Sequence, residues 1–109
     1  MKRRIYVSGP MRGFPGHNYD KFNRAADSLR AAGWHVINPV ELGDIFGTPD
    51  EIDASPAMLE ALLAADCAAV ASCDAICLLP GWERSKGARQ ELLTALQHGL
   101  EIVQEGRGR

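Results

Sequence analysis

Two carboxylates in apolar surroundings are the residues of this sequence best suited to catalysis. Glu91 lies in a predicted helix, at the edge of its apolar stripe and early enough to point back towards a binding crevice. The nearby helix N-terminus favours the ionised form that a carboxylate nucleophile requires; the alternative is a half-exposed glutamate on a helix surface. Asp66 lies in an alanine-rich run, where a buried carboxylate is costly without a partner, so it either faces water or serves a site.

Two loops with glycine and basic residues are suited to binding an anion. In the first, residues 9–13, glycines let backbone N–H groups approach a ligand, and Arg12 can hold an anion through two hydrogen bonds. The alternative is an ordinary turn with a solvated arginine. In the second, Ser85 stands at a predicted helix N-cap, two residues before Gly87. A helix N-terminus with serine and glycine also suits a phosphate, and capping and phosphate binding do not exclude each other.

The pattern of apolar runs and turn residues predicts the elements that position these groups. Short β-rich runs ended by Gly or Pro alternate with segments of helical periodicity. Asn18 is the predicted N-cap of the first helix, and Ser55-Pro56 begins the second. Residues 40–54 are predicted as a flap-like loop with at most a turn of helix. The predicted strands are 4–8, 34–38, 74–79 and 100–103, and the predicted helices run over about 18–32, 55–71 and 86–98.

This alternation of elements predicts an α/β fold. We expect a single doubly wound parallel sheet of about four strands, flavodoxin- or Rossmann-like, in the order 2-1-3-4 with helices on both faces. In such sheets ligands bind at the carboxyl ends of the strands, where the strand order reverses. That switch point lies between the first and third strands, so residues 8–18, 38–44 and 79–87 are expected to meet there.

Length and composition exclude several classes of protein. The 109 residues, 46% hydrophobic, suit one domain, predicted over 1–104 with a disordered tail at 105–109. A formal net charge of −2 argues against a nucleic-acid polymer as partner. No apolar run approaches a membrane span, and none near the N-terminus suits a signal peptide, so we expect a cytoplasmic protein. The cysteine spacing is no zinc signature, and no metal or cofactor is expected.

Motifs spread over nearly the whole chain are similar to those of one enzyme superfamily: Tyr6 to Gly13, Asn38-Pro39, Asp66, Cys73-Asp74 and Gly81 to Glu91. This set resembles the nucleoside 2-deoxyribosyltransferase superfamily, and within it the short deoxyribosyltransferase-like domains of bacteria and their phages. Arg12 and Ser85 are similar to residues of the related 2′-deoxynucleoside 5′-phosphate N-hydrolases, in which the serine contacts the 5′-phosphate. The transferases that act on free nucleosides have an aspartate at that position.

The resemblance implies a role for each matching residue. Glu91 corresponds to the nucleophile that attacks the anomeric carbon, and Asp66 to an active-site aspartate that, like an acid of the flap, can protonate the base. Tyr6 either orients Glu91 or is a core tyrosine. Trp82 either stacks on the base or covers the crevice. The residues expected to contact the substrate are Ser8, Gly9, Pro10, Met11, Arg12, Gly13, Asn38, Trp82, Ser85 and Gly87.

The function that the resemblance implies is cleavage of the N-glycosidic bond of a (deoxy)nucleoside 5′-monophosphate. A covalent glycosyl-glutamate intermediate would form, and free base and (deoxy)ribose 5-phosphate would be released. Two alternatives stay open: a non-catalytic module that binds or senses a nucleotide, and a deoxyribosyltransferase that exchanges bases. Because relatives in the superfamily are dimers or larger, a homodimer or larger homo-oligomer is expected.

Overall fold

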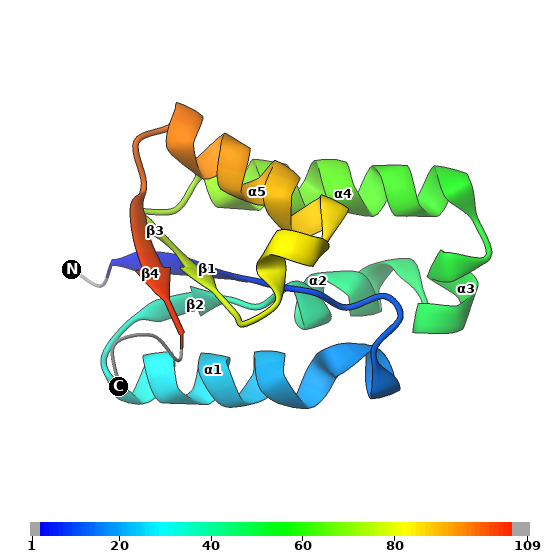
Figure 1. The fold of residues 1–109 in the computed structure, drawn as a ribbon, viewed down its shortest axis with the longest axis horizontal. Coiled ribbons are helices and arrows are strands. Elements are labelled where there is room, and N and C mark those ends of the chain that lie inside the picture. Colours follow the sequence, from blue (N-terminus) through cyan, green and yellow to red (C-terminus); the bar gives the residue numbers. More distant parts are fainter. Residues whose placement is uncertain (1–2, 106–109) are drawn as a thin grey trace.

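Four parallel strands form the centre of the molecule. The computed structural model describes residues 3–105. The strands are β1 (Arg4–Ser8), β2 (His35–Ile37), β3 (Ala75–Leu78) and β4 (Glu101–Gln104). They pair in the order β2-β1-β3-β4, with Tyr6 opposite Ile37 on one side and Ile76 on the other. Figure 1 shows the four strands enclosed between the helices. The predicted strand order is confirmed.

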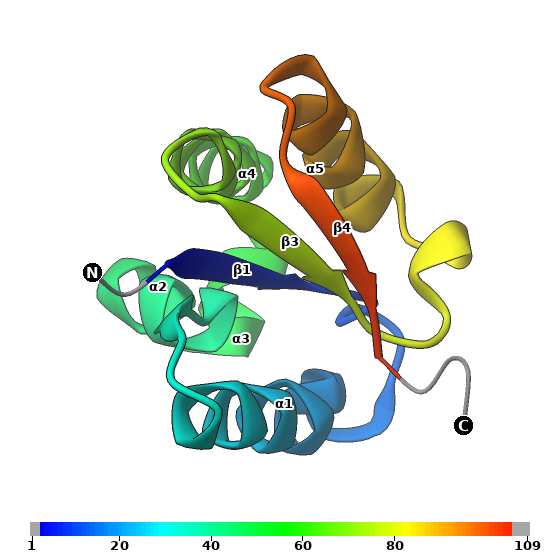
Figure 2. The ribbon, with the colours of Figure 1, turned by 90° about the vertical axis from the view of Figure 1, so that its left-hand side faces the viewer.

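Helices cover both faces of this sheet, as predicted. The helix α1 (Tyr19–Ala31) lies on one face, and α4 (Pro56–Ala71) and α5 (Lys86–Gln97) lie on the other (Figure 2). The first and last residues of each of these helices lie within two residues of the predicted bounds. Ser55 and Ser85 cap α4 and α5 through their side-chain oxygens, which accept from the backbone N–H groups of Met58 and Ala88.

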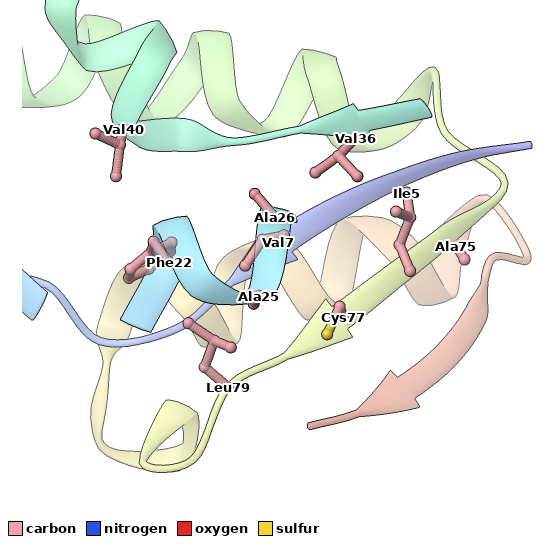
Figure 3. Packing of buried hydrophobic residues seen from close by; sticks show 10 residues of the cluster. All are labelled: Ile5, Val7, Phe22, Ala25, Ala26, Val36, Val40, Ala75, Cys77 and Leu79. Carbon is pink, nitrogen blue, oxygen red and sulfur yellow. The ribbon is translucent and has the colours of Figure 1, made fainter. Parts of the chain in front are cut away.

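The alternation of side chains along β1 decides what each face of the sheet contains. Ile5 and Val7 point into the core cluster under α1, where they pack with Phe22 and Val36 (Figure 3). Tyr6 and Ser8 point to the opposite face, beneath α4 and α5, and both are fully buried there. A tyrosine and a serine at the centre of a sheet require polar partners, because an unpaired buried hydroxyl is costly.

The segment 40–54 is largely helical, and the predicted loop is wrong there. It contains α2 (Pro39–Phe46) and α3 (Pro49–Asp53). Asn38 caps α2 by accepting from the N–H of Val40, and Thr48 caps α3 in a reciprocal pair with Glu51. Both helices have proline in the first position, the arrangement already recognised at Ser55-Pro56. These helices were not predicted because both are short and because glycines stand at positions 43 and 47.

The first loop also differs from prediction, because it contains a short 3-10 turn, η1 (Pro15–Asn18). Gly16, His17 and Asn18 adopt left-handed conformations in succession, with φ of 58°, 54° and 62°. Asn18 precedes α1 as predicted, but its side chain does not cap the helix. Its Nδ2 donates instead to the carbonyl of Pro10, at 2.8 Å. A second 3-10 turn, η2 (Trp82–Arg84), leads into α5.

One further hydrogen bond to β3 follows the last residue of β4, because the N–H of Glu105 donates to the carbonyl of Leu78. The rest of the predicted tail lies outside the described residues. Across residues 3–105 no helix is long and apolar enough to cross a membrane. In the same range, no cluster of His, Cys, Asp and Glu has the grouping of a metal site, and the three cysteines are free.

Candidate active site

Glu91 is held on the sheet by two hydroxyl groups of β1. Its Oε1 accepts from Ser8 Oγ at 2.6 Å, and its Oε2 accepts from the hydroxyl of Tyr6 at 3.1 Å. The glutamate is only 7% exposed. Ser8 and Tyr6 face α5 because they are two residues apart on the same strand, and Glu91 faces them from the second turn of the helix. The carboxylate therefore has a defined orientation, with a free lone pair on each oxygen.

Asp66 is the second buried carboxyl group on this face. It lies on α4, is 8% exposed, and its Oδ1 has no hydrogen-bond partner among the described residues. Burial, with a contribution from the negative charge of Glu91, raises the pKa of Asp66 to about 8, against a smaller opposing effect of the Tyr6 hydroxyl. An unpaired oxygen in so buried a position is expensive for an ionised carboxylate, so the neutral acid is favoured at neutral pH.

Burial raises the pKa of Glu91 as well, to about 7, while the hydrogen bonds from Ser8 and Tyr6 oppose that shift. The pKa of Tyr6 rises well above its ordinary value because of burial and the two nearby carboxyl groups, so its hydroxyl remains a donor. Glu91 has two donors and Asp66 Oδ1 has none, so the negative charge of the pair resides on Glu91 and the proton on Asp66. One carboxylate and one carboxylic acid on the same face of a sheet can serve as nucleophile and acid.

The first and third loops meet in close contact beyond the ends of β1 and β3. A Cβ on Gly9 would lie 2.7 Å from Leu79 Cβ, so no larger residue fits there. Gly81 has φ +89° and lies against Pro10, which is buried. Ser85 follows at the start of α5, and Gly87 lies in its first turn, 4.0 Å below Leu63 of α4 as measured from an ideal Cβ. The predicted convergence of these two loops is thus present.

Two of the predicted contact residues in the first loop are exposed. Arg12 has 65% of its side chain exposed, and its Nε lies 3.4 Å from Asp53 Oδ1 on α3. Gly13 is exposed with φ +83°. Met11 packs against the core cluster on the α1 side, and Trp82 packs in part against the cluster beneath α4 and α5. Their predicted contacts with a substrate remain predictions.

Asn38 and Ser8 have structural partners that sequence reasoning did not identify. The Asn38 side chain is 2% exposed, caps α2 and donates to Asn23 Oδ1 at 2.9 Å. Ser8 is fully buried and donates to Glu91, so it supports the carboxylate. The alternation along β1 places Ser8 on the same face as Tyr6, which was the available signal for this role. The predicted substrate contacts of both residues remain untested.

Two shallow hollows of the described surface lie away from these carboxyl groups. Both run along α1 and are lined by Lys21 and Arg24. Neither is lined by Glu91 or Asp66. Glu91 and Asp66 themselves are 7% and 8% exposed, so little of either residue reaches the surface.

Comparison with known proteins agrees with this geometry. The sequence model of one family, described as a domain of unknown function (DUF4406), matches residues 3–104. The chain belongs to the DUF4406 family. Among curated proteins, nothing matches. Nine chains of solved structures match, and one is the 2-deoxyribosyltransferase of the psychrotolerant bacterium Bacillus psychrosaccharolyticus. Its TM-score is 0.69 at 18% identity, over 93% of this chain and 70% of that chain. The predicted resemblance of this DUF4406 chain to the deoxyribosyltransferases is confirmed at the level of the fold.

Proposed function

We propose that this DUF4406 chain cleaves the N-glycosidic bond of a (deoxy)nucleoside 5′-monophosphate. The observation that carries the proposal is the pair of buried carboxyl groups with different partners. Glu91 accepts from Ser8 and Tyr6 and is oriented as an ionised nucleophile. Asp66 has an unpartnered oxygen and a raised pKa, as a proton donor requires.

The reaction follows from these protonation states. A carboxylate oxygen of Glu91 bonds to C1′ of the sugar as the C1′–N bond breaks, and the electron pair leaves with the base. Asp66 gives its proton to the base. Water then attacks C1′ of the glycosyl ester, loses a proton to the Asp66 carboxylate and releases the Glu91 carboxylate. Two displacements at one carbon retain its configuration. The products are free base and (deoxy)ribose 5-phosphate.

The 5′-phosphate is assigned to the start of α5 and to the first loop. Ser85 Oγ accepts from the N–H of Ala88, which leaves the hydroxyl hydrogen free to donate to a phosphate oxygen. The N-terminus of a helix of 12 residues attracts an anion. Lys86 and Arg84 flank Ser85, and Arg12 lies on the first loop with most of its side chain exposed. This basic mouth suits a nucleotide better than a neutral nucleoside.

The fold shared with a 2-deoxyribosyltransferase favours one second candidate, base exchange. The first displacement is then the same, and a second base replaces water in the second. Addition of a labelled free base distinguishes the two outcomes, because exchange incorporates the label into nucleotide and hydrolysis does not.

A homo-oligomer is proposed from the outer face of α4. Glu60 and Asp66 are the only charged residues of this helix, so it is apolar nearly all round. A helix with this pattern is normally covered on every side. Leu93 and Leu96 on the neighbouring α5 are 55% and 59% exposed. A second copy of the chain is the occupant that the superfamily resemblance implies for this surface. The exposed positions of α4 are Pro56, Ala57, Glu60, Ala61, Ala64 and Ala68, so Glu60 is the one charged residue on a face that is otherwise apolar.

The test of the function is incubation of the purified protein with deoxynucleoside and nucleoside 5′-monophosphates and with the free nucleosides. Chromatography detects released base. We expect release from at least one monophosphate and little from its nucleoside. Binding without release, seen as a rise in melting temperature with one nucleotide, would favour the nucleotide-binding module instead.

A further inference from the structure

We infer that Asp53 is a positioning residue that clasps the first loop and orients Arg12 for the substrate anion. The inference rests on the proposed function in one respect, the contact of Arg12 with that anion. It assigns a specific role to an acid of α3, in the segment 40–54, where the sequence analysis named only an unspecified flap acid that can protonate the base.

The clasp consists of one carboxylate between two side chains of the loop. Asp53 Oδ1 lies 3.4 Å from Arg12 Nε, and its Oδ2 lies 3.0 Å from His17 Nε2. Both oxygens of the carboxylate are thus used, one by each end of the turn between Arg12 and His17. Because Asp53 engages Nε, the two terminal nitrogens of the Arg12 guanidinium remain available to an anion.

The backbone shows why this loop needs to be held. His17 and Asn18 are the only residues other than glycine with positive φ in the described range 3–105, and they are adjacent. Left-handed conformations are unfavourable for such residues and persist where surrounding contacts fix them. Asn18 is fixed by its bond to the Pro10 carbonyl, and His17 by Asp53, with Tyr19 tilted against its ring at 6.1 Å. Removal of Asp53 removes one of these two constraints.

The clasp is expected to affect the placement of the Arg12 side chain more than the stability of the fold. An exposed ion pair contributes little to the stability of a fold. Arg12 is otherwise a long, exposed side chain, which loses much conformational freedom when it binds an anion. A carboxylate that holds Nε in advance reduces that loss, so the expected effect of Asp53 lies on substrate affinity rather than on the chemical step.

The test compares Asp53→Ala with Asp50→Ala, a matched control because Asp50 is an exposed acid on the same helix. Hydrogen exchange of the backbone amides of residues 12–18 is measured first. We expect at least tenfold faster exchange in Asp53→Ala and no change in Asp50→Ala. Equal exchange in the two variants would overturn the clasp. His17→Ala approaches the same contact from the loop side, and it is expected to reproduce the faster exchange.

The second measurement separates positioning from a merely structural effect. With a cleaved nucleotide, Asp53→Ala is expected to raise KM about tenfold while kcat stays within about twofold, since Glu91 is untouched. Asp53→Asn keeps the shape of the side chain but not its charge, and its KM is expected to lie between those of the natural protein and Asp53→Ala. Faster hydrogen exchange in Asp53→Ala with an unchanged KM would overturn the proposed role of Asp53 in orienting Arg12. If no nucleotide is cleaved at all, the proposed function fails, and the exchange experiment still decides on the clasp.

Discussion

Ser8 and Glu91 are 83 residues apart in the sequence, yet Ser8 Oγ lies 2.6 Å from Glu91 Oε1 inside the protein. Neither group is accessible enough to act as an ordinary surface residue, since Ser8 is fully buried and Glu91 is 7% exposed. Folding therefore brings the Glu91 carboxylate of α5 against β1, where two hydroxyl groups donate hydrogen bonds to it. Such an arrangement is costly for stability and suits a group whose reactivity is used.

Stability should depend on pH through Glu91. Its pKa is raised by folding from an ordinary 4.5 to about 7, so the folded state holds a proton that the unfolded state releases in this range. Stability from this group therefore falls as pH rises from about 4.5 to about 7, by about 3 kcal/mol in total. Glu91→Gln is expected to be more stable than the natural protein above about pH 7 and equally stable near pH 4. Urea unfolding of both proteins across this pH range measures the difference in their free energies of unfolding.

The control for the stability experiment is Glu83→Gln, because Glu83 is an exposed glutamate of η2. We expect it to leave the pH dependence unchanged. A Glu91→Gln variant that is less stable than the natural protein at high pH would contradict the account of a costly buried carboxylate.

Removal of the Tyr6 hydroxyl should shift the pH profile of the reaction. That hydroxyl donates to Glu91 Oε2 and lowers the glutamate's pKa. In Tyr6→Phe the pKa rises further, so the ionised nucleophile forms only at higher pH. The acidic limb of kcat is expected to move up by about one pH unit. Tyr19→Phe, which changes the chain's other tyrosine, should leave the profile in place. A downward shift in Tyr6→Phe would show that the donor assignment is wrong.

A charge at Ser85 should separate phosphate binding from helix capping. Aspartate caps a helix as well as serine does, so Ser85→Asp is expected to preserve the fold. Its carboxylate repels a phosphate, and base release from the monophosphate is expected to fall by about 10- to 100-fold. Ser85→Thr, which keeps the hydroxyl, is expected to retain activity. Equal loss on nucleotides and nucleosides would place the phosphate elsewhere.

The outer face of α4 should control the oligomeric state. Ala64 is an exposed residue near the middle of that face, and Ala64→Arg introduces a long charged side chain that a close helix–helix contact cannot accommodate. Light scattering after gel filtration is expected to show a monomer for this variant and a dimer or larger assembly for the natural chain. Ala31→Arg, at an exposed position of α1, is the control and should not dissociate it. A monomeric natural chain would exclude the proposed assembly.

Sequence reasoning recovered the architecture because local signals and topology rules both applied. Apolar runs ended by glycine or proline mark the strands, and right-handed crossovers leave few possible orders. The start of α4 was equally plain, since Ser55 and Pro56 precede a long helix. The starts of α2 and α3 contain the same signal, but helices of 8 and 5 residues lack the periodicity that would have supported it.

Some residues of the candidate site could be proposed from the sequence, for a related reason. Carboxylates in apolar runs attract attention in a sequence, so Glu91 and Asp66 could be found there. Tyr6 was recognised as a residue that either orients Glu91 or is a core tyrosine, and its hydroxyl donates to Glu91. The contact between Glu91 and Ser8 could not be predicted, because it depends on the rotation of α5 over β1. The link between Asp53 and His17 was hidden because it depends on a left-handed conformation at His17, which the sequence does not reveal.

The most direct test of the account is base release by Glu91→Gln, compared with the natural protein on the best monophosphate of the panel. The amide keeps the size of the side chain but is no nucleophile. We expect release to fall by at least about 1,000-fold, while the same nucleotide still raises the melting temperature of the variant. Release that continues at a comparable rate in Glu91→Gln would contradict the central claim, because another group would then be forming the bond to the sugar.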